Sequence, residues 1–102
     1  MSDLLGLLGL GLRGGNLVIG VDGVRTALKG GEVYCLVVAS DASPRAVDKA
    51  VRLAQGLNTP MVQGPAAADI GARLGRPPVM VVGVRNAGLA RGIRAVGSAG
   101  KA

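Results

Sequence analysis

Residues 20–26, with the sequence Gly-Val-Asp-Gly-Val-Arg-Thr, combine residue types that can bind a phosphate or a base edge through the main chain. Gly20 and Gly23 allow a ligand to approach the backbone closely, because glycine has no Cβ. The apolar pattern predicts that a helix begins here, and the free N–H groups at a helix N-terminus attract anions and acceptors. An ordinary turn from a strand into a helix, with Asp22 as its N-cap, explains the same residues, and both interpretations stay open.

A second segment, residues 76–80, places two prolines, a valine and a methionine beside a cation, Arg76. It joins an expected helix to an expected strand, so it should form a stiff and exposed loop. An apolar loop of this kind can pack against an unstacked nucleobase, because the faces of bases are apolar. A connection that the prolines simply make rigid, without any ligand, is the alternative interpretation.

Residues that commonly carry catalysis or hold a metal are scarce in this sequence. It contains no histidine, which removes the commonest general base and the commonest metal ligand. The six acidic residues are scattered, so neither a carboxylate pair nor a hard-metal cage is indicated. Cys35 lies in the apolar run at residues 33–39, which predicts a buried thiol and not a nucleophile. We therefore expect a protein that is not an enzyme, with no cofactor, no metal and no small-molecule substrate.

Gly9, Gly11 and Gly14 match the spacing of the dinucleotide-binding fingerprint. That motif must follow a strand and open a helix, so that the pyrophosphate meets the helix N-terminus. Here the three glycines lie inside the leucine pattern of the first expected helix, and too little chain precedes them for a strand. We therefore do not interpret them as a nucleotide-binding turn.

The formal net charge of the chain is +6, from 12 lysines and arginines against six acids. Arg25 and Lys29 are expected on an exposed helix face, and the chain beyond Asp69 holds no acid. Its cations there are Arg73, Arg76, Arg85, Arg91, Arg94 and Lys101. A basic balance favours polyanionic partners, because phosphate contacts release counterions. A solvated surface that keeps the protein dissolved is the alternative explanation.

Tyr34 is the only aromatic residue in the chain, and its place in the apolar run at residues 33–39 predicts that it belongs to the core. Many single-strand binders stack bases on exposed aromatic rings. If this chain binds RNA, we therefore expect it to recognise a folded shape through backbone, glycines, arginines and the aliphatic loop.

The positioning elements follow from the hydrophobic periodicity, which alternates between helical and strand spacing along the chain. Predicted helices have the apolar faces Leu4, Leu5, Leu8 and Leu12; Val24, Ala27 and Leu28; Val47, Ala50, Val51 and Ala54; the segment 65–74; and Leu89, Ile93 and Val96. Predicted strands are residues 17–19, 33–39, 61–63 and 79–84. Ser43 and Asn86 are expected N-caps, Pro44 should open the third helix, and Gly30-Gly31 and Gly56 should end helices.

Strict alternation with short connections predicts an α/β fold with the order α-β-α-β-α-β-α-β-α and helices on both faces of a sheet. A length of 102 residues predicts one domain, residues 1–102, with an ordered core at about 4–97. No apolar stretch approaches a membrane span, and residues 1–3 do not resemble a signal peptide, so we expect a cytoplasmic protein.

Several segments together resemble the kink-turn RNA-binding ribosomal-protein superfamily, of the L7Ae and L30e type, and most closely its YlxQ-like bacterial branch. The resemblance covers roughly residues 4–97 in one order. It is carried by residues 7–10, 13–18, 36–43, 58–62, 70–75 and, most specifically, Val-Val-Gly-Val-Arg-Asn-Ala-Gly-Leu-Ala at 81–90. It implies a three-layer α/β/α sandwich with a mixed four-stranded sheet.

The resemblance also implies binding of a sharply bent RNA, ribosomal or otherwise, by a monomer associated with the ribosome or with RNA processing. In that family the turn into the second helix and the apolar loop before the last strand make the site. Candidate RNA-binding residues are Arg13, Asn16, Gly20, Val21, Asp22, Gly23, Arg25, Thr26, Lys29, Arg76, Pro77, Pro78 and Val79. The arginines and Lys29 would meet phosphates, the glycines would allow close backbone approach, and residues 77–79 would pack on an extruded nucleotide.

This sequence departs from the family pattern in the first of these loops. The family's turn usually reads Gly-x-Asn-Glu-x-x-Lys, whereas the corresponding positions here are Asp22, Gly23 and Thr26. Asparagine both donates and accepts hydrogen bonds, but an ionised aspartate only accepts them. A protein-interaction module of the same fold, which no longer recognises kink-turns, is therefore the second functional hypothesis.

Overall fold

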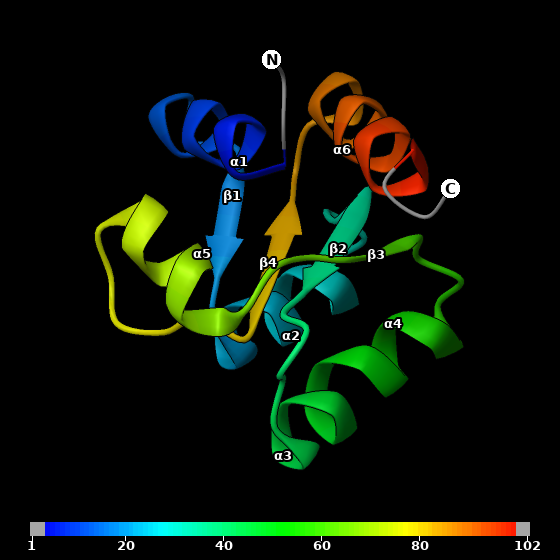
Figure 1. Cartoon of the computed structure of the whole chain (residues 1–102). Coiled ribbons are helices and arrows are strands. Elements are labelled where there is room, and N and C mark those ends of the chain that lie inside the picture. The colour runs from blue at the N-terminus through cyan, green and yellow to red at the C-terminus, as the bar shows by residue number, and fades with distance from the viewer. Residues whose placement is uncertain (1–3, 100–102) are drawn as a thin grey trace.

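The structure is a computed structural model that describes residues 4–99 (Figure 1). Residues 1–3 and Lys101 lie outside the described part. Along the chain the elements are α1 (Leu4–Arg13), β1 (Leu17–Ile19), α2 (Val21–Lys29), β2 (Cys35–Val38), α3 (Pro44–Ala46), the π-helical turn η1 (Val47–Val51), α4 (Arg52–Gly56), β3 (Met61–Gln63), α5 (Ala67–Leu74), β4 (Val81–Val84) and α6 (Ala87–Ala99). The segments α3, η1 and α4 continue into one another, because the residues at their junctions keep helical dihedral angles. The predicted alternation of helices and strands is therefore confirmed.

The four strands form one mixed sheet in the order β1-β4-β2-β3. Strand β4 runs antiparallel to both of its neighbours, β1 and β2, whereas β2 and β3 are parallel. In this register Ile19 lies opposite Val82, and Val38 lies opposite Val81. The start of β4 therefore lies at the same end of the sheet as the ends of β1 and β2.

Helices cover both faces of this sheet, as the sequence predicts (Figure 1). Helices α1, α5 and α6 pack on one face, where Leu8, Ile70 and Ile93 meet the inward side chains of the strands. Helix α2 and the rod formed by α3, η1 and α4 pack on the other face. The fold is thus a three-layer α/β/α sandwich.

Alternate residues of the central strands reach opposite layers of the sandwich, because successive side chains of a strand point to opposite faces. Cys35 and Val37 join the first core cluster, whereas Leu36 joins the second. The buried side chains of the described residues are all apolar, and none is polar or charged. An aliphatic core of this kind gains its stability mainly from area removed from water. Among residues 4–99, no helix has the length and apolar character needed to cross a lipid bilayer.

Local signals for the helix ends are confirmed at several positions. The Ser43 side chain accepts a hydrogen bond from the Ala46 amide, and Pro44 is the first helical residue. The Asn86 side chain likewise accepts from the Leu89 amide at 2.8 Å and begins α6. The rod ends at Gly56, but the left-handed residue that follows it is Asn58, with φ 58°.

Two core assignments made from the sequence are wrong. Strand β2 begins at Cys35, and Tyr34 before it is 52% exposed, although the apolar run predicts a core residue. The Tyr34 amide still donates to the Val84 carbonyl, so the backbone pairs with β4 although the side chain is half exposed. Leu12 is 38% exposed, and Gly11 takes its place on the buried face of α1. A Cβ at Gly11 would lie 2.6 Å from Leu89 Cδ2, so the glycine is what allows α1 to approach α6 closely.

Helix α5 begins at Ala67 and not at Pro65, with Ala66 as its N-cap. The Ala66 side chain cannot accept a hydrogen bond, and Asp41 from a distant loop caps the helix instead. Its Oδ1 accepts from the Ala67 amide at 2.8 Å, across 26 residues of sequence. This contact also places a negative charge at the positive end of the α5 dipole.

We predict that Asp41→Ala lowers the free energy of unfolding by about 1 kcal/mol, because it removes the cap of α5. Asp48→Ala is the matched control, since it removes a surface ion pair with Arg52 in which both side chains are more than 60% exposed. Such pairs contribute under about 0.5 kcal/mol. Urea denaturation of both variants measures the difference, and equal losses would contradict the capping role.

Candidate nucleic-acid interface

The turn between β1 and α2 is built around Gly20, which has φ 96° and ψ 159°. Only glycine adopts such a φ readily. The Gly20 amide donates to the Val81 carbonyl at 3.1 Å, and its own carbonyl accepts from Val24 at 3.0 Å. Gly20 therefore continues the pairing of β1 with β4 and begins α2 in the same residue.

Gly20 is the N-cap of α2, and no side chain caps this helix. Asp22 is not the N-cap that the turn interpretation predicts; it lies exposed within the first turn. Among the described residues, the amides of Val21, Asp22 and Gly23 have no acceptor. The start of α2 therefore presents unsatisfied N–H donors to solvent.

The loop at residues 76–80 is held against the end of α5. Gly75, with φ 70°, ends that helix in the left-handed conformation. The Arg76 amide then donates to the Gly71 carbonyl at 2.8 Å. The Val79 amide donates to the Ala67 carbonyl at 3.0 Å. A Cβ at Gly71 would overlap the carbonyl of Pro77, so this glycine is what allows the loop to pack on the helix.

The two segments meet at a shallow hollow of about 350 Å³. Its lining residues are Ile19, Gly20, Val21, Arg76, Pro77, Pro78, Val79 and Met80. The structure thus brings together segments more than fifty residues apart, because β4 pairs with the end of β1. We call residues 20–23 and 76–80 the paired-loop interface.

The charge of the paired-loop interface is small. Arg76 is exposed, and no carboxylate of the described residues pairs with it. Asp22 is the one acid of the interface and is also exposed. One arginine and one aspartate nearly cancel at long range, so attraction of a polyanion depends on local geometry, namely the free N–H groups and the Arg76 guanidinium.

Val79 is placed differently from the prediction for the apolar loop. It is only 6% exposed and packs into the core, so its side chain offers little surface to a ligand. Pro77 and Pro78 are exposed, and Met80 is half-buried and lines the hollow. Met80 belongs to the apolar loop predicted from the sequence, although it was not among the candidate RNA-binding residues.

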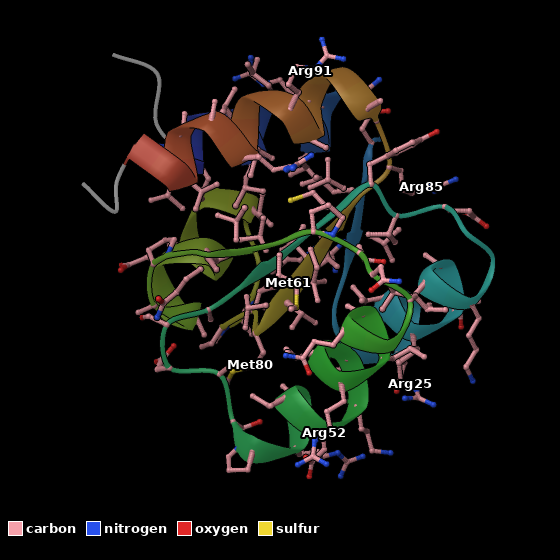
Figure 2. The ribbon with its side chains drawn as sticks, turned by 90° about the vertical axis from the view of Figure 1, so that its right-hand side faces the viewer. Arg25, Arg52, Met61, Met80, Arg85 and Arg91 are labelled. Atoms are coloured by element: carbon pink, nitrogen blue, oxygen red, sulfur yellow. The ribbon has the colours of Figure 1, made fainter. Side chains whose placement is uncertain are left out.

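Arg25 and Thr26, both predicted to contact RNA, use their side chains within the protein. Arg25 is half-buried rather than exposed, and its Nη1 donates to the Lys49 carbonyl at 2.6 Å. Figure 2 shows Arg25 and Met80 on either side of α3 and α4. The Thr26 hydroxyl lies 3.2 Å from the Asp22 carbonyl of its own helix. Arg25 therefore ties α2 to η1, and neither side chain faces the hollow.

Three further predicted residues lie away from the hollow. Asn16 stands at the opposite end of β1 from Gly20, and its carbonyl accepts from the Arg85 amide. Arg13 ends α1 near that same end of the sheet. Lys29 lies in the last turn of α2, whereas the hollow lies at the first. The candidate RNA-binding residues predicted from the sequence are thus divided between the two ends of the sheet.

Cys35, the one cysteine of the chain, does not have the environment of a nucleophilic thiol. Cys35 is fully buried, and burial raises the pKa of its thiol from the ordinary value of 9.0 to about 11, although Arg94 acts in the opposite direction. Within residues 4–99, no group of three or more histidine, cysteine or acidic residues could hold a metal ion.

Comparison with known proteins gives one family and a shared fold. The sequence model of the ribosomal protein L7Ae/L30e/S12e/Gadd45 family matches residues 3–93. A protein of unknown function from Bacillus halodurans superposes with a TM-score of 0.88 and 26% identity, covering 96% of this chain and 99% of that one. A Giardia lamblia 15.5kD RNA binding protein superposes with a TM-score of 0.78 and 19% identity, covering 94% and 85%. No curated protein sequence matches the chain.

We predict that Cys35 reacts with iodoacetamide only when the protein unfolds. With a pKa of about 11, on the order of one thiol in a thousand is ionised at pH 8, and the side chain has no access to solvent. The unfolded chain loses this proton at a lower pH than the native chain. Stability is therefore fully present below about pH 9 and falls as the pH rises toward 11. Mass spectrometry of alkylation in native buffer and in urea measures the reactivity, and rapid native labelling would contradict the prediction.

We predict that Gly71→Ala displaces the loop at residues 76–80 and destabilises the protein by about 1–3 kcal/mol, because the added methyl overlaps backbone that cannot move freely. Gly56→Ala is the control, because a Cβ at Gly56 meets nothing within 4 Å and should stabilise α4 slightly. Amide chemical shifts locate the displacement, and a Gly71→Ala variant with unshifted resonances at 76–80 would refute it.

Proposed function

We propose that this chain, which belongs to the ribosomal protein L7Ae/L30e/S12e/Gadd45 family, is a non-catalytic protein that binds structured RNA through the paired-loop interface. The observation that carries the proposal is the convergence of two separate loops on one hollow. One of them supplies free main-chain donors and the other an apolar surface beside an arginine. The 15.5kD protein of Giardia lamblia, which shares the fold, is named as an RNA-binding protein.

The chemistry of the two loops fits a folded RNA better than a plain duplex. The N–H groups at the start of α2 can donate to a phosphate or to the acceptor edge of a base. Arg76 can contact a phosphate in a second, charge-assisted interaction. Pro77 and Pro78 are exposed and rigid, so they can cover the face of a base that has left the stack. An unstacked base occurs at a bend or internal loop of RNA, and the proposed ligand is therefore a kink-turn-like RNA.

The wider role proposed for the protein follows from this ligand. A protein that recognises a bent RNA element would work on the ribosome or in RNA processing, in the cytoplasm and as a monomer. The YlxQ-like branch is the part of the family to which we assign it. Small-molecule substrates and metal cofactors have no part in the proposal.

A protein-interaction module of the same fold is the second candidate function. Two observations favour it: the exposed Asp22 adds a negative charge where RNA phosphates would approach, and the exposed Gly23 lies beside the Val18 side chain of β1. A Cβ at Gly23 would lie 3.0 Å from Val18 Cγ1, so the glycine has a packing reason that is independent of any ligand. The two candidates differ in what they predict for RNA at moderate salt.

We expect the protein to prefer a kink-turn RNA over two related RNAs in a binding titration. The competitors are the same RNA with its tandem G·A pairs mutated and a plain duplex of equal length. Equal and salt-sensitive binding to all three would indicate charge alone. Absence of binding at moderate salt would favour the protein-interaction module.

We predict that Arg76→Gln weakens binding of the kink-turn RNA about tenfold, because it removes one charge-assisted contact. The slope of log affinity against log salt should also fall by about one. Arg52→Gln is the control, since Arg52 lies on α4, is paired with Asp48 and does not line the hollow. Equal losses of affinity in both variants would show that the loop arginine has no particular role.

A further inference from the structure

A second hollow, of about 410 Å³, lies at the opposite end of α2 from the paired-loop interface. Its lining residues are Leu28, Lys29, Gly31, Val33, Tyr34, Leu57, Asn58, Thr59 and Pro60. They come from the end of α2, the segment that leads into β2 and the segment between α4 and β3. We call this surface the Tyr34 hollow.

Apolar side chains in the Tyr34 hollow are unusually exposed. Tyr34 is 52% exposed and Leu57 is 50% exposed, beside the half-buried Val33 and Pro60. Exposing a large apolar side chain forgoes the free energy that its burial would provide. A half-exposed tyrosine whose backbone is held by a hydrogen bond to the Val84 carbonyl is a suitable platform for stacking.

Positive charge is combined with this ring. Lys29 lines the hollow and is exposed, with no ion-pair partner among the described residues. Pairing of Tyr34 with Val84 brings the next residue, Arg85, close to the rim. The nearby acid, Glu32, lies 3.3 Å from the Arg85 guanidinium, so these two charges largely offset each other and Lys29 carries the net positive charge of the hollow. Asn58, exposed in a left-handed conformation, adds an amide that both donates and accepts.

The two hollows are far enough apart to act separately. Helix α2 has nine residues, which corresponds to a length of about 13 Å. Met80 and Arg85 flank β4, and five residues of extended strand separate their backbones by about 17 Å. Figure 2 shows Met80 and Arg85 well apart in the molecule. A contact at the Tyr34 hollow would therefore involve a different part of the RNA from the part bound by the two loops.

We propose that the Tyr34 hollow binds an unpaired nucleotide of RNA, with the base stacked on Tyr34 and the neighbouring phosphate contacted by Lys29. This inference rests on the proposed function in that the ligand is RNA, but it concerns a site that the paired loops do not share. An aromatic face beside a lysine is the combination that single-strand binding surfaces use, because stacking is tolerant of sequence and the cation follows the backbone. An unpaired strand that flanks a bent RNA would supply such a nucleotide.

Tyr34 provides a direct readout, since the chain has one tyrosine and no tryptophan or phenylalanine. All intrinsic emission above 300 nm therefore comes from this ring. We expect octauridylate to quench the emission in a saturable manner, because a stacked base removes the excited state. Inorganic tripolyphosphate, which offers charge without bases, should leave the emission nearly unchanged. Unchanged emission with octauridylate at low salt, or equal quenching by tripolyphosphate, would overturn the proposal.

Substitutions at Tyr34 and Lys29 distinguish the contributions of base stacking and of charge to the affinity for octauridylate. Tyr34→Leu should weaken the binding of fluorescein-labelled octauridylate about tenfold, and Tyr34→Phe should keep it within about twofold. Lys29→Gln should weaken it and lower the salt dependence by about one phosphate contact, whereas Arg45→Gln on α3 should not. Thermal unfolding shows whether Tyr34→Leu remains folded. Equal affinities of the leucine and phenylalanine variants would exclude stacking.

The same variants distinguish a failure of this inference from a failure of the proposed function. Arg76→Gln should leave quenching by octauridylate unchanged, because Arg76 lines only the first hollow. Tyr34→Leu should bind a minimal kink-turn RNA, which has no single-stranded extension, with unchanged affinity. Normal kink-turn binding without quenching would overturn the Tyr34 site alone, whereas quenching without kink-turn preference would overturn the function assigned to the paired loops.

Discussion

Antiparallel pairing of β1 with β4 holds the two loops of the candidate interface together, because it places the end of the first strand beside the start of the last. The hydrogen bond from the Gly20 amide to the Val81 carbonyl extends this pairing by one residue into the turn. Had the two strands been parallel, the same loops would lie at opposite ends of the sheet. The hollow is thus a consequence of strand direction and not of any attraction between its own side chains.

Two glycines give that arrangement its detailed shape. Gly20 connects β1 to α2 at a φ that residues with a side chain rarely adopt. Because glycine has no side chain to cap the helix, the first amides of α2 stay without an acceptor. Gly71 lets the 76–80 loop lie directly on α5, while Asp41 caps that helix from the connection between β2 and α3. Hydrogen bonds to α5 hold the apolar loop in this position without a ligand, which would lower the entropic cost of the proposed binding.

Most of the positive charge lies outside the paired loops, and this distribution bears on how the protein would bind a long RNA. The interface itself holds one exposed arginine, so the selectivity of the proposed RNA binding would depend on geometry more than on net charge. Helix α2 joins it to a second surface, where a half-exposed ring lies beside Lys29. A folded element at one end of this helix and an unpaired strand at the other would use the two kinds of contact that RNA offers, phosphate and base face.

The sequence by itself determined the features that depend on neighbouring residues. These are the alternation of helices and strands, the caps at Ser43 and Asn86, and the absence of histidine chemistry. Periodicity and capping act within a turn or two, so local residues specify them. The pairing of the two loops was suggested by family resemblance, and spacing alone did not predict it.

Only the tertiary structure decided which side chains are exposed and which are already engaged. The sequence predicts a core position for Tyr34, which is half exposed, and an exposed loop position for Val79, which packs inward. It predicts a free Arg25, which instead donates to the Lys49 carbonyl of η1. Likewise, Met80 lines the first hollow although it was not a candidate residue, whereas Lys29, a candidate residue, lines the second. Exposure and pairing depend on what other layers of the fold bring to a residue, and that is set by contacts between segments far apart in the chain.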